Sequence, residues 1–241
     1  MPSMIDTAFD FRTDAGGRDP DTHSPTLRRY HRLLWSKPLP SGCAFDLDDT
    51  TPGAYLHHRS RLGEFFLTSD SVIPTYTRWS SLQSIVSQLD ETENEAFRTV
   101  GYTIGGMMLF PGNKIEAKQT INGARGFNRK IADRLDLTLE CIRRHYRSQP
   151  SPLRDTLERY GDFFSLFSDF RGYVNFFLLQ DLVTADARRV NFFMAFDDFK
   201  TSAVPRNLDA YADYRRRTIE FVNARNRRIG HWAVENGSRD I

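Results

Sequence analysis

The sequence predicts an α+β fold dominated by helices, folded as a single compact domain with a few short strands and Phe-rich core helices. Three observations support this prediction. Stretches with apolar residues at three- and four-residue spacing outnumber stretches with strict alternation. Nineteen Phe, nine Tyr and three Trp in 241 residues predict a core of aromatic rings, because each ring buries a large apolar area. No internal repeat or low-complexity linker divides the chain, which favours one domain.

The chain is expected to contain an N-terminal lead-in and one globular domain. Residues 1–23 are rich in Gly and Asp and predict an extended segment, whereas residues 24–241 predict the domain. Ser24 followed by Pro25 is typical of a helix start, because Ser caps free backbone N–H groups and Pro fits the first helical position. Residues 62–76 predict either a strand or a short helix, and the pattern does not decide between them.

The later elements follow from periodicity and from the positions of glycine and proline. In residues 135–146, apolar side chains recur at i, i+4, i+7 and i+11, which predicts an amphipathic helix with a buried face. A second stripe, formed by Phe170, Val174 and Phe177, is also expected to be buried. The other expected elements are a helix at 79–100, a buried strand at 102–113, two aromatic helices broken near Gly161 within 151–183, a strand at 188–199 and an Arg-rich helix at 207–234.

Charge and cysteine content argue against several classes of protein. With 33 basic and 31 acidic residues the net charge is +2, so no global field attracts nucleic acid or a membrane surface. Cys43 and Cys141 lack the spacing of a disulfide scaffold or a zinc site, which suits a reducing compartment. No apolar run approaches the roughly 20 residues of a membrane span, and the N-terminus is too polar for a signal peptide. We therefore expect a cytoplasmic protein with no membrane association, metal or cofactor.

Residues 46–50 (DLDDT) match the aspartate loop of haloacid dehalogenase-like phosphatases. In such a loop one Asp attacks phosphate, the Asp two positions later acts as general acid, and both help to hold magnesium. Asp46 and Asp48 occupy these positions, and Asp197 resembles the later acidic residue of the metal site. The buried strand that should precede the loop is missing, however, and a Pro-Gly pair follows where a helix should start. We expect these carboxylates not to converge and interpret the stretch as an Asp-rich turn.

Arg225 and His231 resemble the Arg…His signature of the helical, metal-independent HEPN ribonucleases. Such chemistry needs an Arg that stabilises phosphate charge and a His that moves a proton. A six-residue step on an ideal helix turns the two side chains about 240° apart, which is a poor geometry for joint action. The alternative is an Arg-rich solvated helix face. A third hypothesis is an interaction or assembly module in which the Phe-rich helices at 163–183 pack against a partner.

The densest group of polar residues lies in residues 120–134, which are expected to form a polar loop. Two glycines flank Arg125 and allow the backbone to approach a ligand. Asn122 supplies a donor and an acceptor, and Arg125 supplies a planar fork for phosphate or carboxylate. Arg129 and Arg134 add positive charge beside a helix N-terminus. We therefore predict that Asn122, Arg125, Arg129 and Arg134 bind an anionic ligand, such as a nucleotide or a nucleic-acid phosphate.

An alternative for the same residues is an internal network. Arg125 or Arg134 would then pair with Asp70, Asp133 or Asp136 and tie the loop to the core. The residues alone leave both interpretations open, and they also leave open whether the protein is an enzyme.

Several long phrases resemble an uncharacterised family of bacterial cytoplasmic proteins. They include "IGGMMLFPGNKI", "TINGARG", "DRLDLTLECIRRHY", "DFRGYVNFFLLQDLV" and "FFMAFDDF", in this order, with "SPTLRRYHRLLWSKPLP" and "LGEFFLTSDSVIPTYTRW" nearer the start. The resemblance covers nearly the whole chain. It implies a single-domain protein of unknown biochemical function, and it implies that the acidic loop belongs to this family's own architecture.

Overall fold

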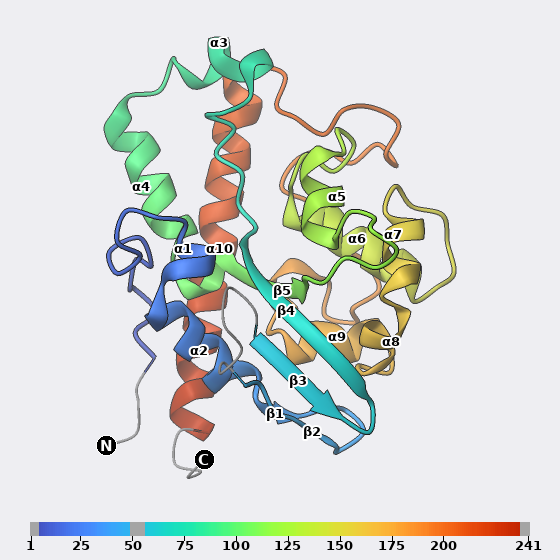
Figure 1. Cartoon of the computed structure of the whole chain (residues 1–241). Coiled ribbons are helices and arrows are strands. Elements are labelled where there is room, and N and C mark those ends of the chain that lie inside the picture. The colour runs from blue at the N-terminus through green and yellow to red at the C-terminus, as the bar shows by residue number, and fades with distance from the viewer. Residues whose placement is uncertain (1–4, 49–55, 237–241) are drawn as a thin grey trace.

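A computed structural model of the chain describes residues 5–48 and 56–236. Helices account for 46% of the chain and strands for 12%, in one compact domain with a Phe-rich buried cluster, so the predicted fold class is confirmed. The long helix α10 runs behind the other elements, with α1, α2 and α4 on one side of the molecule and α5 to α9 on the other (Figure 1). Within the described ranges, none of the helices combines the length and the apolar character that crossing a membrane requires.

The strands form two small antiparallel sheets. The larger sheet has the order β3 (Leu56–Ser60), β4 (Gly63–Ser71) and β5 (Met107–Pro111). β4 answers the question that the sequence left open for residues 62–76, and all five residues of β5 are buried, as expected for the strand at 102–113. The smaller sheet pairs β1 (Lys37–Pro38) with β2 (Ala44–Phe45). β4 matters most for the site, because its last residues pair with β5 and lead into the middle of the molecule.

In the view of Figure 1, helices flank the larger sheet on the left and on the right. The α-helices are α1 (Pro20–His23), α2 (Pro25–Trp35), α3 (Gln83–Val86), α4 (Glu91–Gly101), α5 (Ile121–Phe127), α6 (Leu135–His145), α7 (Arg154–Arg159), α8 (Gly161–Ser165), α9 (Phe170–Phe176) and α10 (Leu208–Asn236). Short 3-10 turns occur at Ser80–Leu82, Ile104–Gly106 and Gln180–Leu182.

Several helices form where capping residues and apolar periodicity predict them. The Ser24 side chain caps α2 by accepting a hydrogen bond from Leu27 N at 3.0 Å, and Pro25 occupies the first turn. α6 and α10 lie close to their predicted bounds. The stripe of Phe170, Val174 and Phe177 is buried, and the Phe177 ring contacts the rings of Trp35 in α2, Phe167 after α8 and Tyr173 in α9.

Three predicted elements differ because side-chain caps interrupt them. The helix expected at 79–100 is split into a 3-10 turn, α3 and α4, since Asp90 caps α4 by accepting from Glu93 N at 2.7 Å. The aromatic segment breaks near Gly161, as predicted, and again before α9, where Asp169 is the cap. Residues 188–199 are turns rather than a strand, because the Asp197 carboxylate accepts from the backbone of Lys200 and Thr201.

The described part of the lead-in is folded rather than extended. Residues 5–19 form successive turns in which the side chains of Asp6 and Asp10 accept backbone N–H groups two residues later. Phe11 is fully buried, with its ring 5.8 Å from the Tyr30 ring of α2. The prediction of an extended segment was wrong for these residues, because their Asp side chains form turns and the buried Phe11 ring packs the segment onto the domain.

Candidate functional site

Residues 121–127 of the predicted anion loop form helix α5. Thr120 caps this helix by accepting from Gly123 N at 3.3 Å, and Ile121 is fully buried beneath it. Gly123 and Gly126 have helical backbones and not the left-handed conformation expected of a ligand loop. The expectation of a loop was wrong because the cap and the buried Ile outweigh the low helix propensity of two glycines.

Arg125 projects from α5 into the protein interior and has no exposed surface. Its Nη1 lies 2.6 Å from Asp70 Oδ2 and 2.8 Å from Asp133 Oδ1. Its Nε donates to Thr138 Oγ1 at 3.2 Å, and Nη2 donates to the Asp133 carbonyl oxygen. The structure therefore contains the internal network that the sequence left open as an alternative, and a free anion has no route to this guanidinium.

The other three predicted residues lie in separate environments. Asn122 donates from Nδ2 to Thr68 Oγ1 of β4 at 3.4 Å, and its Oδ1 is buried without a hydrogen-bond partner in the described ranges. Arg134 is buried and donates to both carboxylate oxygens of Asp136 and, at 3.0 Å, to the Ala203 carbonyl. Arg129 is exposed beyond the end of α5. These residues do not surround one pocket.

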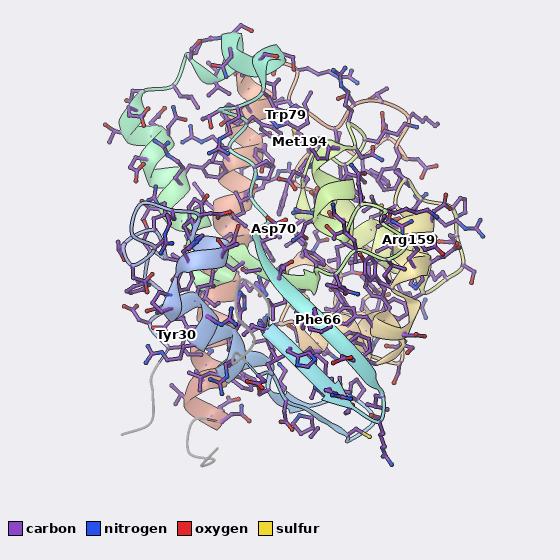
Figure 2. All side chains as sticks on the ribbon, in the orientation of Figure 1. Tyr30, Phe66, Asp70, Trp79, Arg159 and Met194 are labelled. Atoms are coloured by element: carbon purple, nitrogen blue, oxygen red, sulfur yellow. The ribbon has the colours of Figure 1, made fainter. Side chains whose placement is uncertain are left out.

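The carboxylates that bind Arg125 open onto a cleft of about 670 Å³. Asp70, in the middle of the view, and Trp79, above it, both line this cleft (Figure 2). The walls come from α1, the end of β4, the segment that follows it, and α4. Asp21 of α1 joins Asp70 and Asp133, so three carboxylates from separate parts of the chain face one space.

Burial makes these carboxylates unusual acids. Burial, with the nearby charges of Asp133 and Asp21, raises the pKa of Asp70 to about 8 against the opposing effect of Arg125. Burial and the charge of Asp19 raise the pKa of Asp21 to about 6. Burial also raises the pKa of Asp133. The cleft therefore holds one carboxyl group, that of Asp70, which binds a proton near neutral pH, and shifted pKa values of this kind gather at functional sites.

The mouth of the cleft carries the opposite charge. Arg12 is held by Asp10 at 2.5 Å and Glu95 at 2.8 Å, and its guanidinium lies over the Tyr102 ring. Arg18 and Arg78, by contrast, are exposed and form no ion pair with any residue that the structure describes. Arg18 and Arg78 thus give the cleft two exposed positive charges, against the one exposed carboxylate of Asp19 among its lining residues.

Aromatic side chains and a strained backbone complete the cleft. The Tyr76 and Trp79 rings meet edge to face with centroids 5.6 Å apart. Tyr76 and Asp133 both have left-handed backbones, with φ of 60° and 62°. Tyr76 donates from its hydroxyl to the Ala132 carbonyl at 3.3 Å and so joins the two strained segments. Strain of this kind in non-glycine residues often marks a binding or catalytic site.

Residues 5–229 match the Family of unknown function (DUF6994). The chain belongs to this family. No curated protein and no solved structure matches the chain. The DUF6994 family has no stated activity, so its function has to be argued from the cleft.

Arg225 of this DUF6994 chain is a structural residue. It is fully buried, and Nη1 donates to the carbonyls of Gly105 at 3.0 Å and Met107 at 2.8 Å, while Nη2 donates to that of Phe177 at 3.0 Å. His231 is exposed one and a half turns later. The carbonyl cage fixes the guanidinium inside the core, so the pair lacks the shared solvent-accessible face that a ribonuclease requires.

The acidic loop contributes no metal centre in the described residues. Asp46, Asp48 and Asp197 do not gather into a group that could hold a metal ion, while Asp49 lies outside the described ranges. Asp48 belongs to a backbone bridge with His57, and the Asp197 carboxylate closes its own turn. Residues 49 and 50 of the predicted turn lie outside the described ranges, so the interpretation of residues 46–50 as an Asp-rich turn stays a prediction.

The Phe-rich segment at 163–183 packs within the DUF6994 chain itself. Phe163, Phe164, Phe167 and Phe177 are each at most 1% exposed. Their rings contact one another and the rings of α2, which leaves none of these four available for a partner.

Sequence reasoning missed most of the cleft. It named Asp70 and Asp133 only as ion-pair partners and gave no role to Asp21, Arg18 or Arg78. The available signal was weak: an Asp-Pro-Asp helix start and an isolated Arg beside aromatic residues are common in ordinary turns.

Proposed function

We propose that this DUF6994 protein binds a nucleotide in the cleft, with the phosphate at Arg18 and Arg78 and the donor groups of the ligand at Asp21 and Asp70. The observation that carries the proposal is the separation of charge along one cleft. Exposed, unpaired guanidinium groups suit phosphate, because their planar forks bind two oxygens at once. Carboxylates deeper inside suit the N–H and O–H groups of a base or sugar.

The size and walls of the cleft support the same ligand class. A volume of about 670 Å³ falls within the roughly 300–1,000 Å³ of small-molecule sites. Trp79 and Tyr102 are partly exposed along the wall, and flat rings of this kind can stack with a base. Two unpaired arginines and a net charge of +2 favour a mononucleotide over a long nucleic acid, which needs a more extended basic surface.

The proposal keeps the anionic ligand predicted for Asn122, Arg125, Arg129 and Arg134 but moves its binding site. Arg125 acts from beneath the cleft by holding Asp70 and Asp133, rather than by touching phosphate. We also propose a bacterial, cytoplasmic setting. The free cysteines Cys43 and Cys141 support a reducing compartment.

Thermal unfolding in the presence of AMP, GMP, CMP, UMP or inorganic phosphate tests the proposal. At least one nucleotide should raise the melting temperature, logarithmically with concentration and by more than phosphate does. The double variant Arg18→Ala/Arg78→Ala should weaken that response about tenfold in ligand concentration, as expected for lost charge-assisted hydrogen bonds. Arg147→Ala, an exposed arginine after α6, is the matched control and should respond like the parent.

Two results would overturn the proposal. One is the absence of any nucleotide-dependent stabilisation of the parent protein. The other is an equal response from the parent, the double variant and the Arg147→Ala control, which would place the ligand elsewhere.

A further inference from the structure

Four side chains form a continuous line from the core to the cleft. Trp35 and His31 belong to α2, Ser69 belongs to β4, and Asp21 belongs to α1. Trp35 Nε1 lies 3.0 Å from His31 Nδ1, and His31 Nε2 lies 3.0 Å from Ser69 Oγ. Ser69 Oγ lies 3.4 Å from Asp21 Oδ1. The line therefore ends on a carboxylate of the cleft.

The indole of Trp35 determines the direction of every hydrogen bond in this line. An indole N–H can only donate, so His31 Nδ1 must accept, and the single proton of the neutral imidazole resides on Nε2. Nε2–H then donates to Ser69 Oγ, and the hydroxyl proton of Ser69 points to Asp21 Oδ1. Each bond fixes the next, so Trp35 determines the orientation of the Asp21 carboxylate three bonds away.

This arrangement is not a Ser–His nucleophile pair. A general base would need a lone pair on Nε2 facing the hydroxyl, whereas Trp35 forces the proton onto that nitrogen. His31 is 1% exposed, and burial, together with the charge of Arg225, lowers its pKa to about 3. The imidazole is therefore neutral near physiological pH and serves to transmit orientation.

We propose that Trp35, His31 and Ser69 are positioning residues that hold Asp21 as the hydrogen-bond acceptor for N–H donors of the ligand's base. The proposal rests on the function proposed above. Ser69 binds Oδ1, and the Ser71 backbone N–H donates to Oδ2 at 3.3 Å. A carboxylate oxygen can accept two hydrogen bonds, and each oxygen of Asp21 accepts one of these two, so each keeps capacity for one ligand donor. The preferred ligand is a nucleotide whose base carries an amino group.

Titratable and charged groups on neighbouring elements also affect the pKa of Asp21. Asp19 lies on its own segment, Asp70 on β4, Arg125 on α5 and Tyr102 after α4, and each interacts electrostatically with it. None of these four side chains belongs to the line of hydrogen bonds formed by Trp35, His31, Ser69 and Asp21, which we call the relay. A change in the relay that leaves them in place therefore alters Asp21 through Ser69.

Nuclear magnetic resonance on the free protein tests the relay without any ligand. The ¹⁵N shifts of His31 should show a protonated Nε2 and an unprotonated Nδ1 throughout the neutral range. Ser69→Ala should raise the pKa of the Asp21 carboxyl, measured by ¹³C titration, by roughly half a unit to one unit, the worth of one ordinary hydrogen bond. Ser69→Thr keeps the hydroxyl and should restore the parent value. Trp35→Phe, which removes only the N–H of the relay's first member and some ring volume, should mix the two His31 tautomers.

A second experiment measures the binding of GMP and UMP to the same variants. The base of GMP carries an amino group, and the base of UMP does not. GMP should bind the parent more tightly than UMP, and Ser69→Ala should lose about fivefold to tenfold in GMP affinity while Ser69→Thr retains it. A protonated Nδ1 on His31, or an Asp21 titration unchanged in Ser69→Ala, overturns the relay. Equal GMP affinity in Ser69→Ala and the parent, or preference for UMP, overturns its role in recognition. Absence of any nucleotide binding to the parent refutes the proposed function and the recognition role together, and the ligand-free titration still decides the relay.

Discussion

Arg125 Nη1 lies 2.6 Å from Asp70 Oδ2 and so joins helix α5 to the end of strand β4. The arginine is fully buried, while the Asp70 side chain keeps 24% of its surface exposed on the cleft side. In this pair Arg125 is therefore enclosed by the protein, whereas Asp70 is accessible from the cleft. This asymmetry explains how a residue expected to bind the ligand directly can instead shape the site from behind.

Truncating Arg125 should destabilise the fold. Arg125→Ala removes the buried guanidinium that contacts both Asp70 and Asp133 and leaves both carboxyl groups without this partner, so we expect a loss of about 3–5 kcal/mol in the free energy of unfolding. Urea denaturation measures this loss. Arg129→Ala, an exposed arginine four residues later, is the control and should change stability by no more than about 0.5 kcal/mol. Equal stability of the two variants would contradict the buried network.

Removing the ring of Phe177 should be equally costly for a different reason. Phe177 is fully buried, with its ring centroid 4.9 Å from that of Tyr173 and 5.3 Å from that of Trp35. Phe177→Ala leaves a cavity among these rings and should cost about 3–5 kcal/mol in the free energy of unfolding. Phe127→Ala offers a matched control, because Phe127 is 81% exposed and its loss should be nearly neutral. A stable Phe177→Ala protein would place that ring outside the packed core.

The parts of the fold that sequence predicted are those specified by neighbours along the chain. The Ser24 cap starts α2, and the periodic stripe of residues 135–146 matches α6, because both signals act within one or two helical turns. The helix expected at 79–100 was too long because α3 ends at Val86 and the capping Asp90 starts a new helix. Local sequence patterns thus predict much of the secondary structure, and side-chain caps are the main reason why predicted and observed helix bounds differ.

The cleft could not be read from such patterns. Asp21, Asp70 and Asp133 are about 50 to 60 residues apart in sequence, and only the packing of α1, β4 and α5 brings them together. The sequence did identify the charged partners of Arg125, but it could not show which partner faces solvent. Burial decides that question, and burial depends on the whole fold.

Glycine substitutions test the close approach of the Ile104–Gly106 turn to the end of α4. A Cβ at Gly106 would lie 2.0 Å from the Gly101 carbonyl oxygen, a backbone atom that cannot move away freely. Gly106→Ala should therefore destabilise the protein by about 1–3 kcal/mol or more, measured by urea denaturation. Gly161→Ala is the control: nothing lies within 4 Å of its added Cβ, and alanine favours the helix α8, so stability should stay equal or rise. Similar losses at both sites would show that the Gly106 contact is relaxed in solution.

The acidic interior of the cleft should make stability depend on pH, although other buried groups act in the opposite direction. Burial lowers the pKa of His31 to about 3 and that of Lys37 to about 7. The unfolded chain then binds more protons than the fold at these two side chains, so their contributions to stability increase with pH, His31 below about 6.5 and Lys37 above about 7. A comparison between the parent and one variant removes these shared contributions.

Asp70→Asn isolates the carboxyl of the cleft. The pKa of Asp70 is raised from 3.8 to about 8, so between these values the folded protein binds a proton that the unfolded chain has released. Its contribution to stability is complete below pH 3.8 and is lost as pH rises through 8. The free energy of unfolding of the parent minus that of Asp70→Asn, measured by urea denaturation from about pH 5 to about pH 9, should therefore decrease as pH rises. Asp155→Asn, at an exposed position of α7, provides the control and should give a much flatter difference. A difference that grows with pH for Asp70→Asn would mean that Arg125 keeps this carboxyl ionised throughout, and that the cleft presents a fixed negative charge to its ligand.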